Sequence, residues 1–353
     1  MPTASAQPLE TALDAVMRRA FPADRPGGAL LVMIGGKEVF RRGYGLANPE
    51  TKTPVTPETN FRMASVSKQF TAMAILLLEK QGKLSVEDNL LRFFPDFNPA
   101  VGRKVKLRHL LTHSSGIRDY ETLQAPERKD QIFDREVVEL LKPQDATYFE
   151  PGSRFQYSNS GFCLLEQIVE KVSGRPYAEW MEEAVFTPLG MTGTTFYEPG
   201  KPILNRSIGY ALDEKGGIRL SDQSITSGTK GDGCLYTSLT DYRKWADALT
   251  TNRLIDRQEP FRRIQRPIEG LTGSAYGLGW FVTETKDGPP TFFHSGSTCG
   301  FSNCVVRISE TQTLIVLFSN LADYHRPFED ILQGVRSQTR VPADVWPLHR
   351  LTR

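Results

Sequence analysis

Apolar residues near both ends of the chain occur in short runs separated by turns rich in glycine and polar residues. Runs of this kind are typical of strands bounded by tight turns. They predict strands over residues 29–34, 38–44, 276–283, 291–295, 301–308 and 313–319. The first two are joined at Gly35 and Gly36, and such a short connection predicts a hairpin, and therefore an antiparallel sheet.

Helical periodicity marks other segments. Residues 9–20 and 327–338 predict an amphipathic helix near each end of the chain. Over residues 61–80 the apolar residues follow the i, i+3, i+4, i+7 spacing of a helix packed against a core, at Phe70, Met73, Ala74 and Leu77. Ser65 would then lie in the first turn of that helix.

Strands from both ends of the chain must meet in one sheet, because the region between them is mostly helical. We therefore expect an α/β (α+β) fold in which the terminal helices flank an antiparallel sheet. Residues 1–60 and 267–353 would form the sheet subdomain, and residues 61–266 an inserted, mostly helical subdomain, with substrate in the crevice between them. With 353 residues, 39% of them hydrophobic, the chain can bury a large core as one compact catalytic unit.

Other segments lack a clear period. Residues 119–145 and 198–230 are polar and predict irregular structure. Asp287 and Gly288 stand between apolar runs, which predicts a hairpin turn, and residues 340–353 predict an extended tail.

Charge and hydropathy exclude some classes of function. A net charge of +2 with no basic stripe argues against a nucleic-acid partner. The longest wholly apolar run, residues 72–78, is far too short to span a membrane. Residues 1–7 lack the charged start and apolar centre of a secretory signal, so we expect a cytoplasmic protein, or a periplasmic or secreted one if a leader has been removed. The oligomeric state stays open.

The cysteines allow two interpretations. Cys299 and Cys304 flank a predicted turn and could form a disulfide. Free, buried thiols are the interpretation that we favour for the whole set, Cys163, Cys234, Cys299 and Cys304.

Candidate chemistry begins with a Ser-x-x-Lys motif at Ser65 and Lys68. Residues three apart share one face of a helix, so the lysine can reach back to the serine hydroxyl. The same motif recurs at Ser227 and Lys230, but glycines surround that copy and predict a loop.

A serine hydroxyl is a weak nucleophile near neutral pH and needs an adjacent base and a site for the developing oxyanion. Lys68 could be that base, since burial and the positive end of a helix favour a neutral lysine. Tyr157 could relay the proton, and Asn159, two residues later, offers an amide that both donates and accepts hydrogen bonds.

The third motif has several candidate positions in the chain. Lys-x-Gly occurs at Lys80, Lys215 and Lys286, which we interpret as a helix end, a polar loop and a hairpin turn. His294, Ser295 and Gly296 instead precede a predicted strand, where glycine permits the close approach of a substrate or another backbone.

Ser-x-x-Lys, Tyr-x-Asn and His-x-Gly in this order resemble the motifs of serine β-lactamases and penicillin-binding-protein-like hydrolases. The branch that the chain resembles contains class C β-lactamases, D-amino-acid peptidases, D-Ala-D-Ala carboxypeptidases and esterases. Connecting segments share the likeness, which extends over residues 9–336 and includes 109–117, 157–174 and 187–191. In such proteins the irregular segments around the cleft would determine specificity.

The resemblance implies a role for each motif residue. Ser65 would be the acylated nucleophile, Lys68 and Tyr157 the proton-transfer pair, and Asn159 a contact for substrate and lysine. The oxyanion hole would consist of the backbone N–H groups of Ser65 and Ser297, and His294 and Gly296 would belong to the same substrate-binding strand.

His294 stands where class C β-lactamases have a lysine. A histidine lacks the permanent charge that would hold a β-lactam carboxylate, and we expect its own charge to change around neutral pH. The residue therefore favours a peptidase or esterase over efficient antibiotic hydrolysis. The deacylating glutamate of class A enzymes has no clear match.

Other residues of the chain could form rival sites. His109 and His113 have a spacing that can bind zinc on a helix, but no His-Glu-x-x-His motif is present and Gly116 soon ends the helix, so we expect no metal and no cofactor. No Gly-x-Ser-x-Gly motif supports an α/β-hydrolase. Asp232 resembles a turn residue, and Ser65 alone could be a helix N-cap.

Two functional classes remain open. The first is a serine hydrolase that forms an acyl-enzyme on Ser65 with a small ester, a D-amino-acid peptide or amide, or a β-lactam. The second is a penicillin-binding sensor or scaffold that acylates slowly. Retention of both Lys68 and Tyr157 favours turnover, because a binding surface requires neither.

Overall fold

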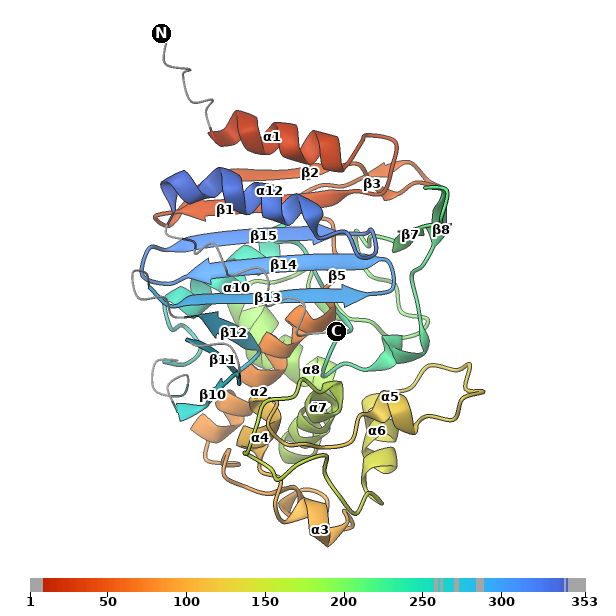
Figure 1. The fold of residues 1–353 in the computed structure, drawn as a ribbon, viewed down its shortest axis with the longest axis vertical. Coiled ribbons are helices and arrows are strands. Elements are labelled where there is room, and N and C mark those ends of the chain that lie inside the picture. The colour runs from red at the N-terminus through yellow and green to blue at the C-terminus, as the bar shows by residue number, and fades with distance from the viewer. Residues whose placement is uncertain are drawn as a thin grey trace.

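An eight-stranded antiparallel sheet organises the molecule, whose computed structural model describes residues 9–256, 260, 263–269, 273–283, 289–339 and 341 (Figure 1). The strand order is β10-β11-β12-β13-β14-β15-β1-β2. The strands are β1 (Gly28–Ile34), β2 (Lys37–Tyr44), β10 (Arg266–Pro267), β11 (Ser274–Gly277), β12 (Trp280–Thr283), β13 (Thr291–Thr298), β14 (Phe301–Ile308) and β15 (Thr313–Ser319).

The two ends of the chain meet at the β1–β15 pair. Leu31 lies opposite Val316 in this antiparallel ladder, and the N-terminal hairpin thereby extends the sheet of C-terminal strands. The predicted hairpin at Gly35 and Gly36 is present, with both glycines at positive φ (59° and 75°). The predicted fold class is therefore confirmed.

Two terminal helices cover one face of the sheet, α1 (Leu9–Ala20) and α12 (Arg326–Val335), the latter followed by the 3₁₀ turn η5 (Arg336–Gln338) (Figure 1). Because successive side chains of a strand point to opposite faces, Leu30 packs in the core beneath these helices, whereas Leu31 packs in the core on the other side. The sheet is thus buried on both faces, which explains its long apolar runs.

The helical region covers the other face, with Phe70 and Trp245 stacked at 4.2 Å between ring centroids. Its helices and helical turns are η1 (Ala64–Ser67), α2 (Lys68–Lys80), η2 (Leu90–Arg92), α3 (Pro99–Gly102), α4 (Leu107–Leu111), α5 (Tyr120–Leu123), α6 (Asp134–Leu141), α7 (Asn159–Ser173), α8 (Tyr177–Met181), η3 (Glu182–Phe186), α9 (Thr187–Leu189), η4 (Ile225–Gly228) and α10 (Leu239–Thr250). Short strands complete it: β3 (Leu46–Asn48), β4 (Thr53–Pro54), β5 (Phe61–Arg62), β6 (Thr195–Phe196), β7 (Tyr210–Leu212), β8 (Ile218–Leu220) and β9 (Leu235–Thr237).

Some predicted boundaries were wrong for local reasons. The strand predicted over 276–283 is two strands, because Leu278 and Gly279 turn the chain at positive φ (52° and 79°). The helix predicted over 61–80 begins as a regular α-helix only at Lys68, since Phe61 pairs with β9 and Ala64 has a φ of 48°. The irregular segment predicted over 119–145 contains α5 and α6.

The next predictions concern the cysteines, a membrane span and two segments near the end of the chain. The four cysteines are free, and Cys299 is half-buried while the others are buried. No helix among the described residues is long and apolar enough to cross a membrane. The turn expected at Asp287 and Gly288 and the tail expected over 340–353 lie outside the described residues, apart from residue 341.

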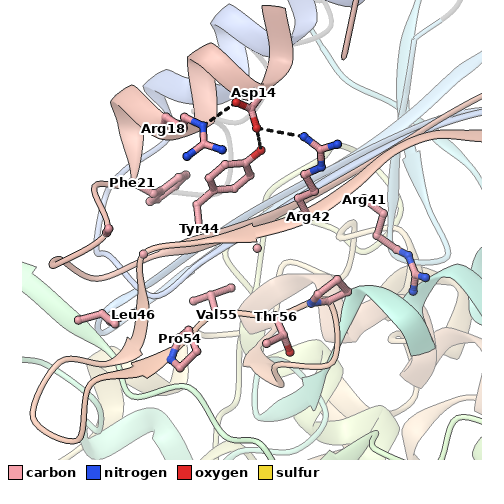
Figure 2. A pocket seen from close by; sticks show the side chains of 14 residues that line it. Asp14, Arg18, Phe21, Arg41, Arg42, Tyr44, Leu46, Pro54, Val55 and Thr56 are labelled. Atoms are coloured by element: carbon pink, nitrogen blue, oxygen red, sulfur yellow. Dashed lines mark hydrogen bonds and ion pairs between the residues drawn. The ribbon is translucent and has the colours of Figure 1, made fainter. Parts of the chain in front are cut away.

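A network of charges joins α1 to the outer strand β2 beside a cavity of about 580 Å³ (Figure 2). Asp14 accepts hydrogen bonds from Arg18 (2.6 Å), Arg42 (3.2 Å) and Tyr44 (2.6 Å). The Tyr44 hydroxyl and these arginines hold the pKa of the Asp14 carboxyl below its usual value, the tyrosine having the largest effect. Arg42 also forms an ion pair with Glu10 at 2.5 Å. Because the two carboxylates and two guanidiniums compensate one another, we interpret this cavity as a structural feature of the sheet edge.

Candidate active site

Ser65 lies in η1, the 3₁₀ turn that connects β5 to α2. The preceding residue, Ala64, has a left-handed backbone with a φ of 48°, a conformation that residues with a Cβ rarely adopt. Hydrogen bonds fix the turn, because Met63 N donates to Leu235 O at 2.7 Å and Val66 N donates to Met63 O at 3.2 Å. Ser65 is thereby presented, half-buried, just before α2 begins.

Lys68 is fully buried, and its Nζ lies among three oxygen atoms. The distances are 3.0 Å to Ser65 Oγ, 2.9 Å to Asn159 Oδ1 and 3.0 Å to the carbonyl oxygen of Asp232. A lysine ammonium has three donors, so this set uses all of them. The contact joins a hydroxyl to a possible base at hydrogen-bond distance, the geometry that nucleophile activation requires.

Tyr157 presents its ring to the same lysine. Lys68 Nζ lies 5.0 Å from the centroid of the Tyr157 ring, and His113 packs on that ring at 4.1 Å between centroids. The Tyr157 hydroxyl oxygen is buried and has no hydrogen-bond partner in the described part of the chain. A buried polar atom without a partner is uncommon and needs an explanation, and a bound substrate could supply the missing hydrogen bond.

Asn159 is the first residue of α7 and connects Lys68 to the surface. Its Oδ1 contacts Lys68, as given above, and its Nδ2 donates to Glu121 Oε1 at 3.0 Å. Glu121 is exposed, but the partial burial of its carboxyl raises its pKa, and the nearby Asp119 adds to this effect. Glu121 was missed in the sequence because it lies on a four-residue helix in a segment that we expected to be irregular.

β13 carries the third motif alongside η1. A Cβ on Gly296 would lie 2.3 Å from Met63 O, so only glycine permits this approach. β12 pairs with β13 at residues 291–293, and among the described strands none pairs with that edge from His294 onward. Ser297 is exposed, and its Oγ lies 2.9 Å from His325 Nε2.

His294 is fully buried, and both ring nitrogens are hydrogen-bonded within the protein. Nδ1 donates to Ser295 O at 2.6 Å, so Nε2 of the neutral ring accepts from the Tyr276 hydroxyl at 3.0 Å. Burial lowers the pKa of His294 to about 3. Our expectation that its charge changes around neutral pH was therefore wrong: the ring is neutral there.

His113 and His109 each accept a hydrogen bond from a backbone N–H group. His113 Nδ1 accepts from Ser158 N at 3.1 Å, and His109 Nδ1 accepts from Lys106 N at 3.2 Å. Burial, with a smaller effect of Lys68, holds the pKa of His113 well below its usual value. In the part of the chain that the structure describes, no group of three or more His, Cys, Asp or Glu side chains could hold a metal ion.

The second Ser-x-x-Lys copy is not assembled like the first. Ser227 Oγ accepts from Ser224 N at 2.8 Å, and Lys230 Nζ forms an ion pair with Glu198 at 3.1 Å. Ser227 lies in η4 rather than at the start of a long helix. The contrast with Ser65 follows from the element that carries each motif.

Buried carboxyl groups behind Lys68 were also missed in the sequence. Asp134 accepts from Lys230 N at 2.6 Å and from Gly231 N at 3.0 Å, which fixes the turn that contains Asp232. Burial and the neighbouring Asp232 raise the pKa of Asp134 to about 7. Asp232 is a turn residue, as predicted, and it also supplies the carbonyl that contacts Lys68.

A family comparison agrees with this arrangement. The Beta-lactamase family model matches residues 13–339. The chain belongs to the beta-lactamase family. This confirms the resemblance drawn from the motifs, and it makes the chain a member of a family of serine hydrolases with D-aminopeptidases and penicillin-binding proteins among its relatives.

Individual beta-lactamase family members are similar over most of the chain. A penicillin-binding protein of Bacillus subtilis is 29% identical over 83% of this chain and 68% of its own length. A D-aminopeptidase of Brucella anthropi is 30% identical over 91% of this chain, which spans only 62% of that enzyme. The structure of an octameric penicillin-binding protein homologue from Pyrococcus abyssi superposes with a TM-score of 0.79 at 26% identity, covering 97% of this chain and 79% of the homologue.

Proposed function

We propose that this beta-lactamase family protein is a serine hydrolase that forms an acyl-enzyme on Ser65 with D-amino-acid amides or peptides, or with small esters. The observation that carries the proposal is the 3.0 Å contact between Lys68 Nζ and Ser65 Oγ. The D-aminopeptidase among the relatives supports this substrate class.

In the proposed reaction, neutral Lys68 removes the proton of Ser65 as Oγ attacks the substrate carbonyl carbon. The oxyanion that forms receives hydrogen bonds from the backbone N–H groups of Ser65 and Ser297. Tyr157 relays the proton that Lys68 has taken to the departing amine or alcohol as its bond to the carbonyl carbon breaks. Water then attacks the acyl carbon, the Lys68 and Tyr157 pair takes a proton from this water, and the pair returns it to Ser65 Oγ as the acid leaves. The steps require neither a metal ion nor a cofactor.

Asn159 and His294 have supporting roles in this proposal. Asn159 orients Lys68 and can hydrogen-bond the substrate. His294 supports β13 from inside, since its ring nitrogens already contact Ser295 and Tyr276. Gly296 lets this strand approach η1.

Two other functions are less well supported. A β-lactamase would benefit from a cation beside the strand for the β-lactam carboxylate, and the neutral, buried His294 provides none. A slowly acylating binding protein remains the second candidate because penicillin-binding proteins are among the relatives. It would need no relay hydroxyl, whereas the unpartnered Tyr157 hydroxyl favours turnover.

Covalent labelling tests the nucleophile. A serine-directed phosphonate should add one label per chain, at Ser65, as measured by intact mass and peptide mapping. Ser65→Ala should prevent labelling, and Ser227→Ala, the matched control, should not. Label on Ser227, or an unlabelled Ser65, would refute the assignment.

Substrate screening then separates the functions. D-amino-acid amides and short p-nitrophenyl esters should be hydrolysed with a higher kcat/KM than a chromogenic cephalosporin. A preference for the cephalosporin would favour the β-lactamase, and stable labelling without turnover of any substrate would favour the binding protein.

A further inference from the structure

Arg307 is a charged residue in an otherwise apolar layer. It lies on β14 and faces α10, on the same side of the strand as Phe301 and Val305, which belong to the core beneath the helical region. Only 3% of its surface is exposed. A charge buried this deeply is unfavourable unless another group compensates it.

The described residues compensate Arg307 only in part. One terminal nitrogen donates to Thr250 Oγ1 at 3.1 Å, and no carboxylate in the described part of the chain forms an ion pair with the guanidinium. Burial lowers the pKa of Arg307 to about 10, so the group remains charged at neutral pH. Within the described chain, most of its five N–H donors therefore have no partner and can bind a ligand.

The guanidinium lines a cavity of about 390 Å³ between α10, the β1–β2 turn and the β14–β15 turn. Polar side chains face this cavity beside apolar ones, with hydroxyl and amide groups from Thr250, Thr251, Gln312 and Thr313. Asp247 lines its rim, where its carboxyl is more than half exposed and lies 3.9 Å from Arg243. The residues of the candidate active site do not contribute to this cavity.

We propose that this cavity binds a small oxyanion, a carboxylate or a phosphate, through Arg307. A planar guanidinium matches both groups with two parallel hydrogen bonds, and hydroxyl and amide side chains can complete the coordination. The volume admits a small organic acid or a phosphate. This site is independent of the hydrolase proposed above.

Arg307 could instead have a purely structural role. The negative end of α10 lies beside Arg307, and a cation there is stabilising. However, Arg307 donates to the hydroxyl of Thr250, and within the described chain it donates to no carbonyl of the helix end. A helix end offers only a fraction of a charge, so it neutralises the guanidinium incompletely.

Anion titrations test the proposal. Thermal unfolding and calorimetry would be measured on the 353-residue protein with sodium phosphate or sodium succinate, and compared with sodium chloride at equal ionic strength. We expect a saturable rise in Tm with at least one oxyanion. Arg307→Met should weaken its binding by about tenfold to a hundredfold, the usual effect of losing a charge-assisted hydrogen bond. Arg253→Gln, which removes an exposed arginine just after α10, should bind like wild type.

A second variant covers the case in which Arg307→Met does not fold. Ala246 lines the cavity from α10, and Ala246→Leu would fill it while retaining the arginine. We expect this variant to lose the response as well. A response to phosphate alone or to succinate alone would identify the class of oxyanion. If the oxyanions raise the Tm of wild type no more than chloride does, or if the variants that fold bind the oxyanion as wild type does, the proposal is wrong.

Discussion

Lys68 is the residue on which the proposed chemistry depends most. As an ammonium it donates to Ser65, Asn159 and the Asp232 carbonyl, and as a neutral amine it can accept the Ser65 proton. The same three contacts therefore hold the base in place before and after proton transfer. Tyr157 complements it, because its hydroxyl has no partner within the described chain.

Removing either group should lower turnover without unfolding the protein. General acid–base groups typically contribute about 10²- to 10⁴-fold, so Lys68→Ala and Tyr157→Phe should each reduce kcat by an amount in that range. Steady-state kinetics with the best D-amino-acid amide or ester would measure it, with circular dichroism to verify folding. Lys230→Ala, a lysine of the other Ser-x-x-Lys copy, is the control. Near-normal kcat in both active-site variants would remove these residues from the mechanism.

The lowered pKa of His294 leads to a prediction about the pH dependence of stability. Its pKa of about 3 in the folded protein is lower than the usual 6.5, so the unfolded chain binds a proton that the folded chain does not. This stabilisation is present above pH 6.5 and is lost as pH falls toward 3. Between pH 7 and pH 5 the loss should be about 2 kcal/mol.

The variant His294→Gln isolates this effect from the other ionisable groups. Urea denaturation of both proteins at pH 7 and pH 5 gives their free energies of unfolding. The advantage of wild type over the variant should shrink by about 2 kcal/mol at the lower pH, because glutamine has no proton to gain. An advantage that stays constant between the two pH values would mean that His294 is protonated in the folded protein.

At the scale of elements, the sequence predicted what depends on local pattern. The predicted bounds of β14 and β15 match the structure because unbroken apolar runs end at polar turns. The β11–β12 turn was missed because Leu278 adopts a positive φ that its side chain does not announce. The turn is held by a tertiary contact, because Gly279 packs against the backbone of Gln69.

Part of the candidate site could likewise be predicted from local sequence, and part could not. Ser65 and Lys68 are neighbours on one helical turn, so their spacing alone predicts the contact. The Asp232 carbonyl contacts Lys68 across 164 positions of the chain, and no local pattern indicates such a pairing. The burial of His294 was likewise hidden, because it depends on Tyr276 from another strand.

The closeness of β13 and η1 yields a prediction for Gly296→Ala. The added Cβ would lie 2.3 Å from Met63 O, so the strand must move away from Ser65. A shift of about 1 Å can cost about 10²-fold in rate, and we expect kcat/KM to fall by that order. Steady-state kinetics would measure the loss.

Gly334→Ala is the matched control for that substitution. Gly334 lies exposed on α12, and a Cβ there would meet nothing within 4 Å. Activity should be unchanged, and stability should rise by up to about 1 kcal/mol because alanine favours a helix. Full activity of Gly296→Ala would show that β13 tolerates displacement and is not part of the oxyanion site.

At the scale of the whole molecule, both chain ends and the helical region share one core. Leu31 of β1, Val316 of β15 and Phe70 of α2 belong to the same buried cluster. The boundary that we propose, with residues 1–60 and 267–353 in one subdomain and 61–266 in the other, therefore passes through a continuous apolar layer. Neither subdomain could be removed without exposing much of the other's core.

This shared core predicts that the two subdomains unfold together. In a Trp280→Phe, Trp346→Phe background, which removes the two tryptophans of residues 267–353, Trp180 and Trp245 report on the helical region by fluorescence, while far-ultraviolet circular dichroism reports on all the helices and strands. Both signals should change in one transition with the same midpoint.

Leu31→Ala should lower the free energy of unfolding by about 2 to 5 kcal/mol, as expected for a fully buried leucine, and should shift both midpoints equally although the residue lies in the sheet. Leu204→Ala, at a leucine that is 72% exposed, should change the free energy by no more than about 0.5 kcal/mol. Because the core that contains Leu31 is continuous, a fluorescence midpoint that stays fixed while the dichroism midpoint falls would show two subdomains that unfold independently.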